Sequence, residues 1–276
     1  MKAPAPVQHF SAQHIFDVTG KSFVVTGAAS GLGEAMAQVL SSNQAHVLLL
    51  DKDAASLKRV HDRLAAAGGQ VESQTIDVTN THELKLHIAN FISNRQGLDG
   101  LFANAGVSGG PGFGTELGAV SGGIEAQSPA AWENLFRINL HGVIASMQSA
   151  VGIMKEQGRG SLVLTASIAG VKAEPFVSYA YAAAKSSVVQ VMRQAALELA
   201  PFGVRVNAIA PGFITTNIAD RRLHDSATAA LLGARVPMGR LGSPDELHGV
   251  TLLLASDASS YMTGTLIPVD GGVLAL

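Results

Sequence analysis

The chain has 276 residues, of which 47% are hydrophobic, 14% charged and 5% aromatic, and its formal net charge is −2. This near-neutral balance argues against nucleic acid as the main partner, because phosphate binding needs a basic surface. The absence of cysteine excludes disulfides, thiol nucleophiles and cysteine-ligated metal sites, and the nine histidines form no metal-binding motif, so we predict no metal. No segment is long and apolar enough to span a membrane, and the first residues do not resemble a signal sequence, so we expect a cytoplasmic protein.

Apolar runs typical of strands alternate along the chain with longer amphipathic stretches typical of helices. Strands are predicted at Ser22–Thr26, His46–Leu50, Val71–Ile76, Leu98–Ala103, Ser161–Thr165, Val204–Ile209 and Thr265–Val269. Helices are predicted at Gly31–Leu40, Ala54–Ala67, Thr81–Arg95, Trp132–Glu156, Ser178–Ala200 and Asp245–Ala255. Strict alternation predicts an α/β fold with a doubly wound, mostly seven-stranded parallel sheet and helices on both faces.

The pattern indicates a single domain at residues 20–276, preceded by a loose N-terminal arm at residues 1–19. Residues 106–127 form a glycine-rich insertion between the fourth strand and the long helix, and their glycines predict a flexible segment. The insertion either covers a substrate site, meets a neighbouring subunit or is an ordinary surface loop. Two helix starts are marked by Ser128–Pro129 and Ser243–Pro244, the second of which also fits a capping box with Glu246.

A glycine-rich turn from Thr26 to Gly33 joins the first strand to the first helix. Glycines there allow a tight turn and a close approach of a pyrophosphate to the free N–H groups of the helix N-terminus. Asp51 closes the second strand, where a carboxylate accepts hydrogen bonds from a ribose and repels a 2′-phosphate. We therefore predict NAD in preference to NADP; the plainer alternative is that Asp51 only caps the next helix.

A phenol and an ammonium group lie four residues apart at Tyr181 and Lys185, on one face of a predicted helix. An ordinary tyrosine has a pKa near 10, and a nearby cation lowers it toward a value useful for proton transfer. Ser167 follows the fifth strand and could hydrogen-bond a substrate oxygen. Asn139 lies in an apolar helix, where its amide must find partners as a structural bridge or as part of a proton path.

Together these motifs resemble the short-chain dehydrogenase/reductase family, and the resemblance covers roughly Gly20 to Gly272. It implies four catalytic residues, Asn139, Ser167, Tyr181 and Lys185. It also implies a larger set of cofactor-binding residues: Gly27, Ser30, Gly31, Leu32, Gly33, Asp51, Asp77, Val78, Asn104, Ala105, Gly106, Tyr181, Lys185, Pro211, Gly212, Ile214 and Thr216.

The resemblance implies an NAD-dependent oxidoreductase that interconverts a secondary alcohol and its ketone by hydride transfer. Tyr181 would be the general acid and base, Ser167 would orient the substrate oxygen, Lys185 would hold the nicotinamide ribose, and Asn139 would hold a water. Residues 213–240 would form a substrate lid, whose Arg221, Arg222 and His224 are expected to be solvated. A homotetramer packed through the two long helices is implied, with a dimer as the alternative.

Two features depart from the family pattern: the longer 106–127 insertion, and a spacing of 14 residues between Ser167 and Tyr181, about one more than usual. Tyr179 has Ala183 rather than lysine four residues later, so Tyr181 is assigned to catalysis and Tyr179 to packing or the pocket. Phe176, Val177 and Phe213 suggest a cyclic or otherwise apolar substrate. Two alternatives stay open: a related lyase or epimerase, and a non-catalytic NAD-binding regulatory protein.

Overall fold

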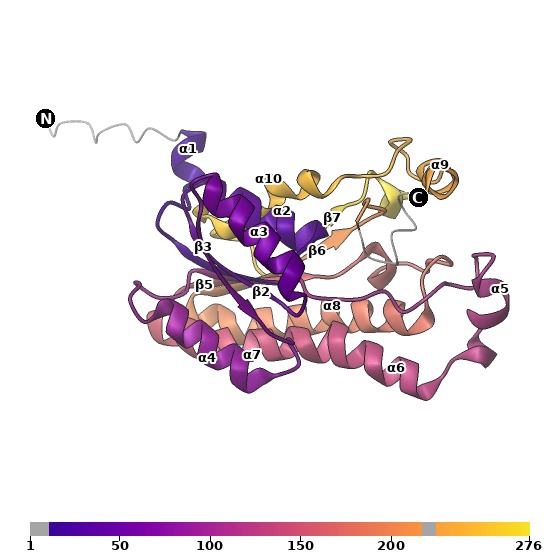
Figure 1. Ribbon diagram of the computed structural model, residues 1–276, viewed down its shortest axis with the longest axis horizontal. Coiled ribbons are helices and arrows are strands. Elements are labelled where there is room, and N and C mark those ends of the chain that lie inside the picture. The colour runs from indigo at the N-terminus through magenta and orange to yellow at the C-terminus, as the bar shows by residue number, and fades with distance from the viewer. Residues whose placement is uncertain (1–10, 217–224) are drawn as a thin grey trace, which may run out of the picture.

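Seven parallel strands form one sheet in the computed structural model, which describes residues 11–216 and 225–276 (Figure 1). The strand order is β3-β2-β1-β4-β5-β6-β7, and every neighbouring pair is parallel. The strands are β1 (Ser22–Thr26), β2 (His46–Asp51), β3 (Gln70–Thr75), β4 (Gly100–Ala103), β5 (Gly160–Thr165), β6 (Val204–Pro211) and β7 (Leu266–Val269). The predicted doubly wound sheet is therefore confirmed.

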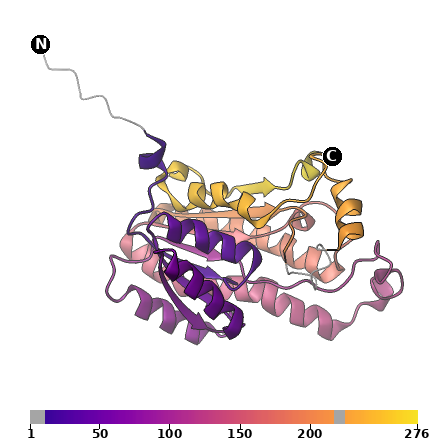
Figure 2. The same ribbon diagram turned by 45° about the horizontal axis from the view of Figure 1, so that its top comes forward.

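Helices cover both faces of the sheet (Figures 1 and 2). On one face lie α2 (Gly31–Ser42), α3 (Ala54–Ala66) and α10 (His248–Ala255), and on the other α4 (Thr81–Ile92), α7 (Gly142–Gln157) and α8 (Tyr179–Leu199). Alternate residues of one strand enter different layers: Val24 packs with α4, α7 and α8, whereas Phe23 and Val25 pack with α2, α3 and α10. Buried parallel strands need an apolar residue at nearly every position for this reason.

The short helices complete the described chain. They are α1 (Ala12–Ile15), α5 (Gly118–Ser121), η1 (Ile124–Ala126), α6 (Pro129–Phe136), η2 (Arg137–His141), η3 (Ile168–Gly170), η4 (Ala200–Phe202), α9 (Ser226–Gly233), η6 (Pro244–Leu247), η7 (Asp257–Ser259) and η8 (Val273–Ala275). Ser128 caps α6 through the Ala131 N–H, and the Ser243–Glu246 capping box is present, as predicted. No helix within the described ranges is long and apolar enough to cross a membrane.

The long helix predicted over Trp132–Glu156 is not one continuous α-helix. It begins at Pro129 as α6, passes through one wider π-type turn at Arg137–His141 (η2) and continues as α7. A π turn takes one residue more than an α-helical turn, and the sequence analysis predicted a continuous helix through it. The wider turn contains Asn139, which is fully buried.

Two segments expected to be loose are partly ordered. In the arm, α1 is capped by Ser11, and Val18 is 1% exposed and belongs to the core beneath α2. In the region expected to be a lid, α9 and Val236 are described, whereas Arg221, Arg222 and His224 lie outside the described residues.

The strand order determines where the predicted site residues lie on the sheet. From β1 the chain winds toward β3 on one side, and from β4 toward β7 on the other, so the connections leaving β1 and β4 diverge. In open parallel sheets a crevice forms at the carboxyl ends of two such strands, and ligands bind there. The glycine turn after β1 and the Asn104–Gly106 segment after β4 meet at this crevice.

Candidate active site

The turn after β1 brings the backbone of two segments into close contact. Gly27 adopts a positive φ of 69°, and the N–H groups of Gly27 and Ala28 both donate to the Leu50 carbonyl. A Cβ on Gly27 would lie 2.8 Å from the Ala105 Cα, and a Cβ on Gly33 only 2.0 Å from the Gly27 carbonyl oxygen. These positions require glycine for packing as well as for conformation.

The N-terminus of α2 opens onto this turn. Ser30 occupies the N-cap position, but its side chain makes no capping hydrogen bond with any described residue. The first-turn N–H groups of a helix have no partner within the helix, and they carry the positive end of its dipole. The N–H groups from Gly31 to Gly33 can therefore receive an anion, and phosphate binding by Ser30, Gly31, Leu32 and Gly33 stays a prediction.

Asp51 is fixed against the glycine turn. One carboxylate oxygen accepts the Ala29 N–H at 3.0 Å, and the other accepts the Asp53 N–H at 3.0 Å. Asp53, not Asp51, caps α3 by accepting the Ser56 N–H. Asp51 therefore does not cap α3. Its carboxylate lies beside the glycine turn.

The segment after β4 is held by two threonines that the sequence analysis did not single out. The Thr26 hydroxyl accepts the N–H groups of Asn104 and Ala105, each at 3.1 Å. The Thr165 hydroxyl donates to the Asn104 side-chain oxygen, whose amide donates in turn to the Gly27 carbonyl. Their only signal in the sequence is a polar residue at the end of a buried strand.

Ser167, Tyr181 and Lys185 come together where β5 ends and α8 begins. Ser167 follows β5, its side chain caps η3, and its hydroxyl lies near enough to the Tyr181 hydroxyl to lower the pKa of Tyr181. The Lys185 ammonium donates to the Thr165 carbonyl at 2.7 Å and lies 5.8 Å from the centre of the Tyr181 ring. Lys185 is 3% exposed, so the structure assembles the predicted serine, tyrosine and lysine into one cluster.

Burial shapes the proton affinities of this cluster. Burial raises the pKa of Tyr181, and the hydrogen bond with Ser167 opposes this change. Burial lowers the pKa of Lys185 to about 8, because removal from water disfavours the charged ammonium. Burial therefore affects the pKa of Tyr181 more than its contact with Ser167 does.

Asn139 acts as a bridge between the π turn and the segment after β4. Its side-chain oxygen accepts the Val107 N–H, and its amide donates to the Val107 carbonyl, both at 2.9 Å. A Cβ on Gly106 would lie 2.6 Å from the Asn139 oxygen and 3.6 Å from the Lys185 nitrogen. Of the two roles considered for Asn139, these contacts are those of the structural bridge.

The segment after β6 brings Thr216 to the start of α2. A Cβ on Gly31 would lie 3.3 Å from the Thr216 side chain. Thr216 is 7% exposed, yet its hydroxyl has no hydrogen-bond partner among the described residues. Pro211, Gly212 and Ile214 precede it, and the Gly212 N–H donates to the Val269 carbonyl. A buried hydroxyl without a partner beside a phosphate-binding turn fits a ligand that supplies one.

Asp77 and Val78 lie further along the sheet, after β3. The Asp77 carboxylate accepts the Thr79 N–H at 2.9 Å, which holds the pKa of Asp77 below its usual value. Val78 is 6% exposed and packs against Gly142 at the start of α7. Both residues follow the carboxyl end of a strand next to β2, which places them on the same sheet edge as Asp51.

The insertion is ordered and docked on the loop that precedes Tyr181. Pro111 forms an antiparallel bridge with Val177, and the Gly114 N–H donates to the Pro175 carbonyl at 2.8 Å. A Cβ on Gly112 would lie 2.2 Å from that carbonyl oxygen. Here glycine permits close backbone packing, a role that the sequence analysis did not consider for the insertion. Tyr179 contacts Phe113 of the insertion, which confirms it as a packing residue.

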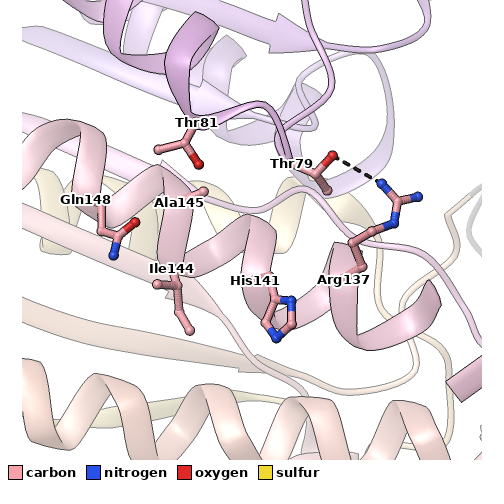
Figure 3. A pocket seen from close by; sticks show the side chains of 7 residues that line it. All are labelled: Thr79, Thr81, Arg137, His141, Ile144, Ala145 and Gln148. Carbon is pink, nitrogen blue, oxygen red and sulfur yellow. Dashed lines mark hydrogen bonds between the residues drawn. The ribbon is translucent and has the colours of Figure 1, made fainter. Parts of the chain in front are cut away.

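A hollow on the described surface lies away from these residues (Figure 3). It has a volume of about 370 Å³ and lies between the start of α4, η2 and α7. Its lining is made by Thr79, Thr81, Arg137, His141, Ile144, Ala145 and Gln148, none of which is a predicted site residue. Within the described residues there is no cluster of three or more histidine and acidic side chains that could hold a metal ion.

Comparison with known proteins gives consistent matches along nearly the whole chain. A family model described as enoyl-(acyl carrier protein) reductase matches residues 27–274. Cyclohexanol dehydrogenase from Rhodococcus sp. (strain TK6) is 35% identical over 271 residues, covering 92% of this chain and 96% of the relative.

Solved structures show the same fold. A short-chain type dehydrogenase/reductase from Mycobacterium marinum superposes with a TM-score of 0.86 and 31% identity, covering 95% of this chain and 98% of the other. A gluconate 5-dehydrogenase from Burkholderia cenocepacia J2315, in complex with NADP and tartrate, has a TM-score of 0.84 and 28% identity, with coverage of 96% and 100%. With the crevice, the glycine turn and the Ser167–Tyr181–Lys185 cluster, these matches establish that the chain belongs to the short-chain dehydrogenase/reductase family of oxidoreductases, which use a nicotinamide cofactor.

Proposed function

We propose that the protein is an NAD-dependent oxidoreductase that interconverts a secondary alcohol and its ketone, with Tyr181 as general acid and base. The observation that carries this proposal is the cluster at the sheet crevice, where the half-buried Tyr181 side chain lies beside Ser167 and the Lys185 ammonium. Its neighbour Tyr179 is turned to the insertion and has no lysine partner.

Each side chain has a distinct task in the proposed reaction. A bound nicotinamide supplies the chemistry of hydride acceptance and donation. Tyr181 takes the hydroxyl proton of the alcohol during oxidation and returns it during reduction. Ser167 hydrogen-bonds the substrate oxygen and holds it near the Tyr181 hydroxyl. Lys185, anchored on the Thr165 carbonyl, holds the nicotinamide ribose, and its positive charge favours the phenolate form of Tyr181.

The proposed proton relay through Asn139 has a specific requirement. Both polar atoms of its side chain already pair with Val107, so a water is best held by the backbone of the surrounding turn. A π turn leaves a carbonyl without its usual α-helical partner, which supplies an acceptor for such a water near Lys185.

The residues of the crevice fit a dinucleotide. The N–H groups of α2 from Gly31 to Gly33 would hold the pyrophosphate, Asp51 the adenosine ribose, and Asp77 with Val78 the adenine side. Asn104, Ala105 and Gly106 would line the middle of the site. Pro211, Gly212, Ile214 and Thr216, whose hydroxyl has no partner among the described residues, would meet the nicotinamide end.

NAD is proposed over NADP because of Asp51, although a related gluconate 5-dehydrogenase was solved with NADP. Replacing Asp51 with serine is expected to shift the ratio of kcat/KM for NAD over NADP at least roughly tenfold toward NADP, since a carboxylate repels the 2′-phosphate. Steady-state kinetics with both cofactors measure this ratio. Asp53→Ser is the control, because serine keeps the α3 cap and Asp53 lies two residues away. An unchanged ratio in Asp51→Ser would remove the basis for NAD.

A cyclic or otherwise apolar secondary alcohol is the proposed substrate class. Phe213 packs with Ile168, the residue after Ser167, and the relative named cyclohexanol dehydrogenase supports the same class. The test is a panel of secondary alcohols and ketones, with cyclohexanol included, followed by the absorbance of reduced nicotinamide with NAD and NADP in parallel. NAD binding without net turnover of any member would favour the lyase, epimerase or regulatory alternatives.

The insertion at 106–127 is proposed to form one side of the substrate pocket. Residues 213–240 are proposed to form a lid over the same pocket. What supports this is the insertion's backbone contact with Pro175 and Val177 in the loop between Ser167 and Tyr181. In Figure 1, α5 of the insertion and α9 of the 213–240 region lie at the same end of the molecule.

A cytoplasmic homotetramer is the proposed assembly, with the α6–α7 helix and α8 between subunits and a dimer as the alternative. His141 at the end of the π turn and Gln148 in α7 are exposed, and together with Ile144 they line the hollow of Figure 3. A Cβ on Gly152 of α7 would meet nothing within 4 Å. A helix of a second subunit can approach such a surface closely. Sedimentation of the purified chain measures the mass of the assembly.

A further inference from the structure

The turn that carries Ser167 is packed between α8 and the C-terminal end of the chain. On the α8 side, a Cβ on Gly170 would lie 2.7 Å from the Lys185 carbonyl, and the Ser186 hydroxyl donates to the Gly170 carbonyl. On the other side, Ile168 is 2% exposed and packs with Val273. The position of Ser167 relative to Tyr181 and Lys185 therefore depends on what holds this turn from the C-terminal side.

Lys172 joins these two parts directly. Its N–H donates to the Ile168 carbonyl at 3.0 Å, which ties it to the residue after Ser167. Its ammonium donates to the Val273 carbonyl at 3.1 Å across the cluster of Ile168, Val236 and Val273. A hydrogen bond from a charged donor is among the stronger contacts in a protein, and Lys172 is only partly exposed.

The C-terminal turn is itself rigidly built. The Asp270 carboxylate accepts the N–H groups of Gly272 and Leu274, at 2.9 and 2.8 Å. The Gly271 carbonyl accepts the Met238 N–H, and a Cβ on Gly271 would lie 2.5 Å from the Val236 side chain. The last residues of the chain thus connect the end of the region after α9 with the turn that bears Ser167, and the C-terminus lies at that end of the molecule (Figure 1).

We infer that Lys172 is a positioning residue, which clamps the Ser167 turn to the C-terminal turn formed by Asp270–Ala275 and so holds Ser167 at the Tyr181 hydroxyl. The kinetic part of this inference rests on the proposed function, but the clamp itself does not. Hydrogen exchange of backbone amides tests the clamp without any substrate, because local opening exposes N–H groups that the clamp protects.

Lys172→Met keeps the length of the side chain and removes its ammonium. We expect amide exchange to rise roughly tenfold in the peptides covering residues 167–172 and 270–276, as follows from losing one charge-assisted hydrogen bond. Lys172→Arg should restore protection because it keeps a cationic donor. Lys155→Met is the matched control, a partly exposed lysine whose ammonium pairs with Glu198 at the far end of α7, and it should change neither peptide.

Asp270→Asn weakens the C-terminal turn, to which Lys172 is joined. It removes a negative charge, whereas Lys172→Met removes a positive charge. If the clamp operates, Lys172→Met and Asp270→Asn both raise exchange at residues 167–172, and the double variant adds little to the larger single effect. With an alcohol that the protein turns over, both also lower kcat about fivefold to tenfold while the Kd for NAD stays within twofold. Opposite effects of the two variants on kcat would indicate long-range charge instead of positioning.

The inference would be overturned if Lys172→Met left amide exchange at residues 167–172 unchanged. It would also be overturned if Lys172→Arg lost protection to the same extent as Lys172→Met. Failure of the whole alcohol panel would overturn the proposed function alone, because the exchange experiment still decides whether the clamp exists. Changed exchange with unchanged kcat would leave the clamp in place and remove its role in positioning Ser167.

Discussion

Replacing Tyr181 with phenylalanine is expected to lower kcat roughly a thousandfold while leaving the Kd for NAD within about twofold. Positioned general acid–base groups contribute on the order of 10² to 10⁴ in rate, and Tyr181 is the proposed donor and acceptor at the substrate oxygen. The ring remains in phenylalanine, so packing beside Lys185 is retained, whereas the hydroxyl that meets Ser167 is lost. Steady-state kinetics give kcat, and fluorescence titration gives the NAD affinity.

Tyr179→Phe is the matched control for this variant. Tyr179 lies two residues earlier on the same helix, and its ring contacts Phe113. Loss of its hydroxyl should leave kcat within about twofold. A wild-type kcat in Tyr181→Phe, or an equal loss in both variants, would contradict the proposed mechanism.

Replacing Gly33 with alanine is expected to weaken NAD binding by roughly 100-fold. The added Cβ would lie 2.0 Å from the Gly27 carbonyl oxygen and 2.6 Å from the Asn104 amide nitrogen. The Gly27 oxygen belongs to the backbone, and the Asn104 side chain is held by its hydrogen bonds with Gly27 and Thr165, so the glycine turn must shift away from α2. Overpacking of this kind costs on the order of 1–3 kcal/mol, and the upper part of that range corresponds to about 100-fold in affinity.

Calorimetric titration with NAD measures the loss, and the melting temperature shows whether the variant still folds. Gly249→Ala is the control, because Gly249 lies in α10 and a Cβ there would meet nothing within 4 Å. Alanine should stabilise or leave unchanged that helix without affecting NAD affinity. Undiminished NAD binding by a folded Gly33→Ala protein would show that the turn does not approach the cofactor.

The predicted elements agree with the structure where the signal is local. β1, the turn after it and α2 follow from an apolar run, glycines and a helical period within some twenty residues. The capping residues Ser128 and Ser243 mark their helices correctly. The pairing of Tyr181 with Lys185 follows from helical geometry, since residues four apart share one face.

Elements that depend on distant contacts were harder to predict. The π turn around Asn139 lies where the helix bridges to Val107, some thirty residues away in the chain, and a local pattern contains no information on that contact. The insertion is rich in glycine, which predicts mobility from local freedom. Its docking on Pro175 and Val177 uses the same glycines for close packing instead.

The sequence by itself determined the α/β class, the glycine turn between β1 and α2 and the pairing of Tyr181 with Lys185, because these follow from periodicity and spacing within single elements. Only the tertiary structure decided the direction of the pKa shifts of Tyr181 and Lys185, which arise mainly from burial. It also decided the partners of Asn139 and the contact of Lys172 with the C-terminal turn. Burial and partnership depend on residues brought together from far along the chain, and no local pattern encodes them.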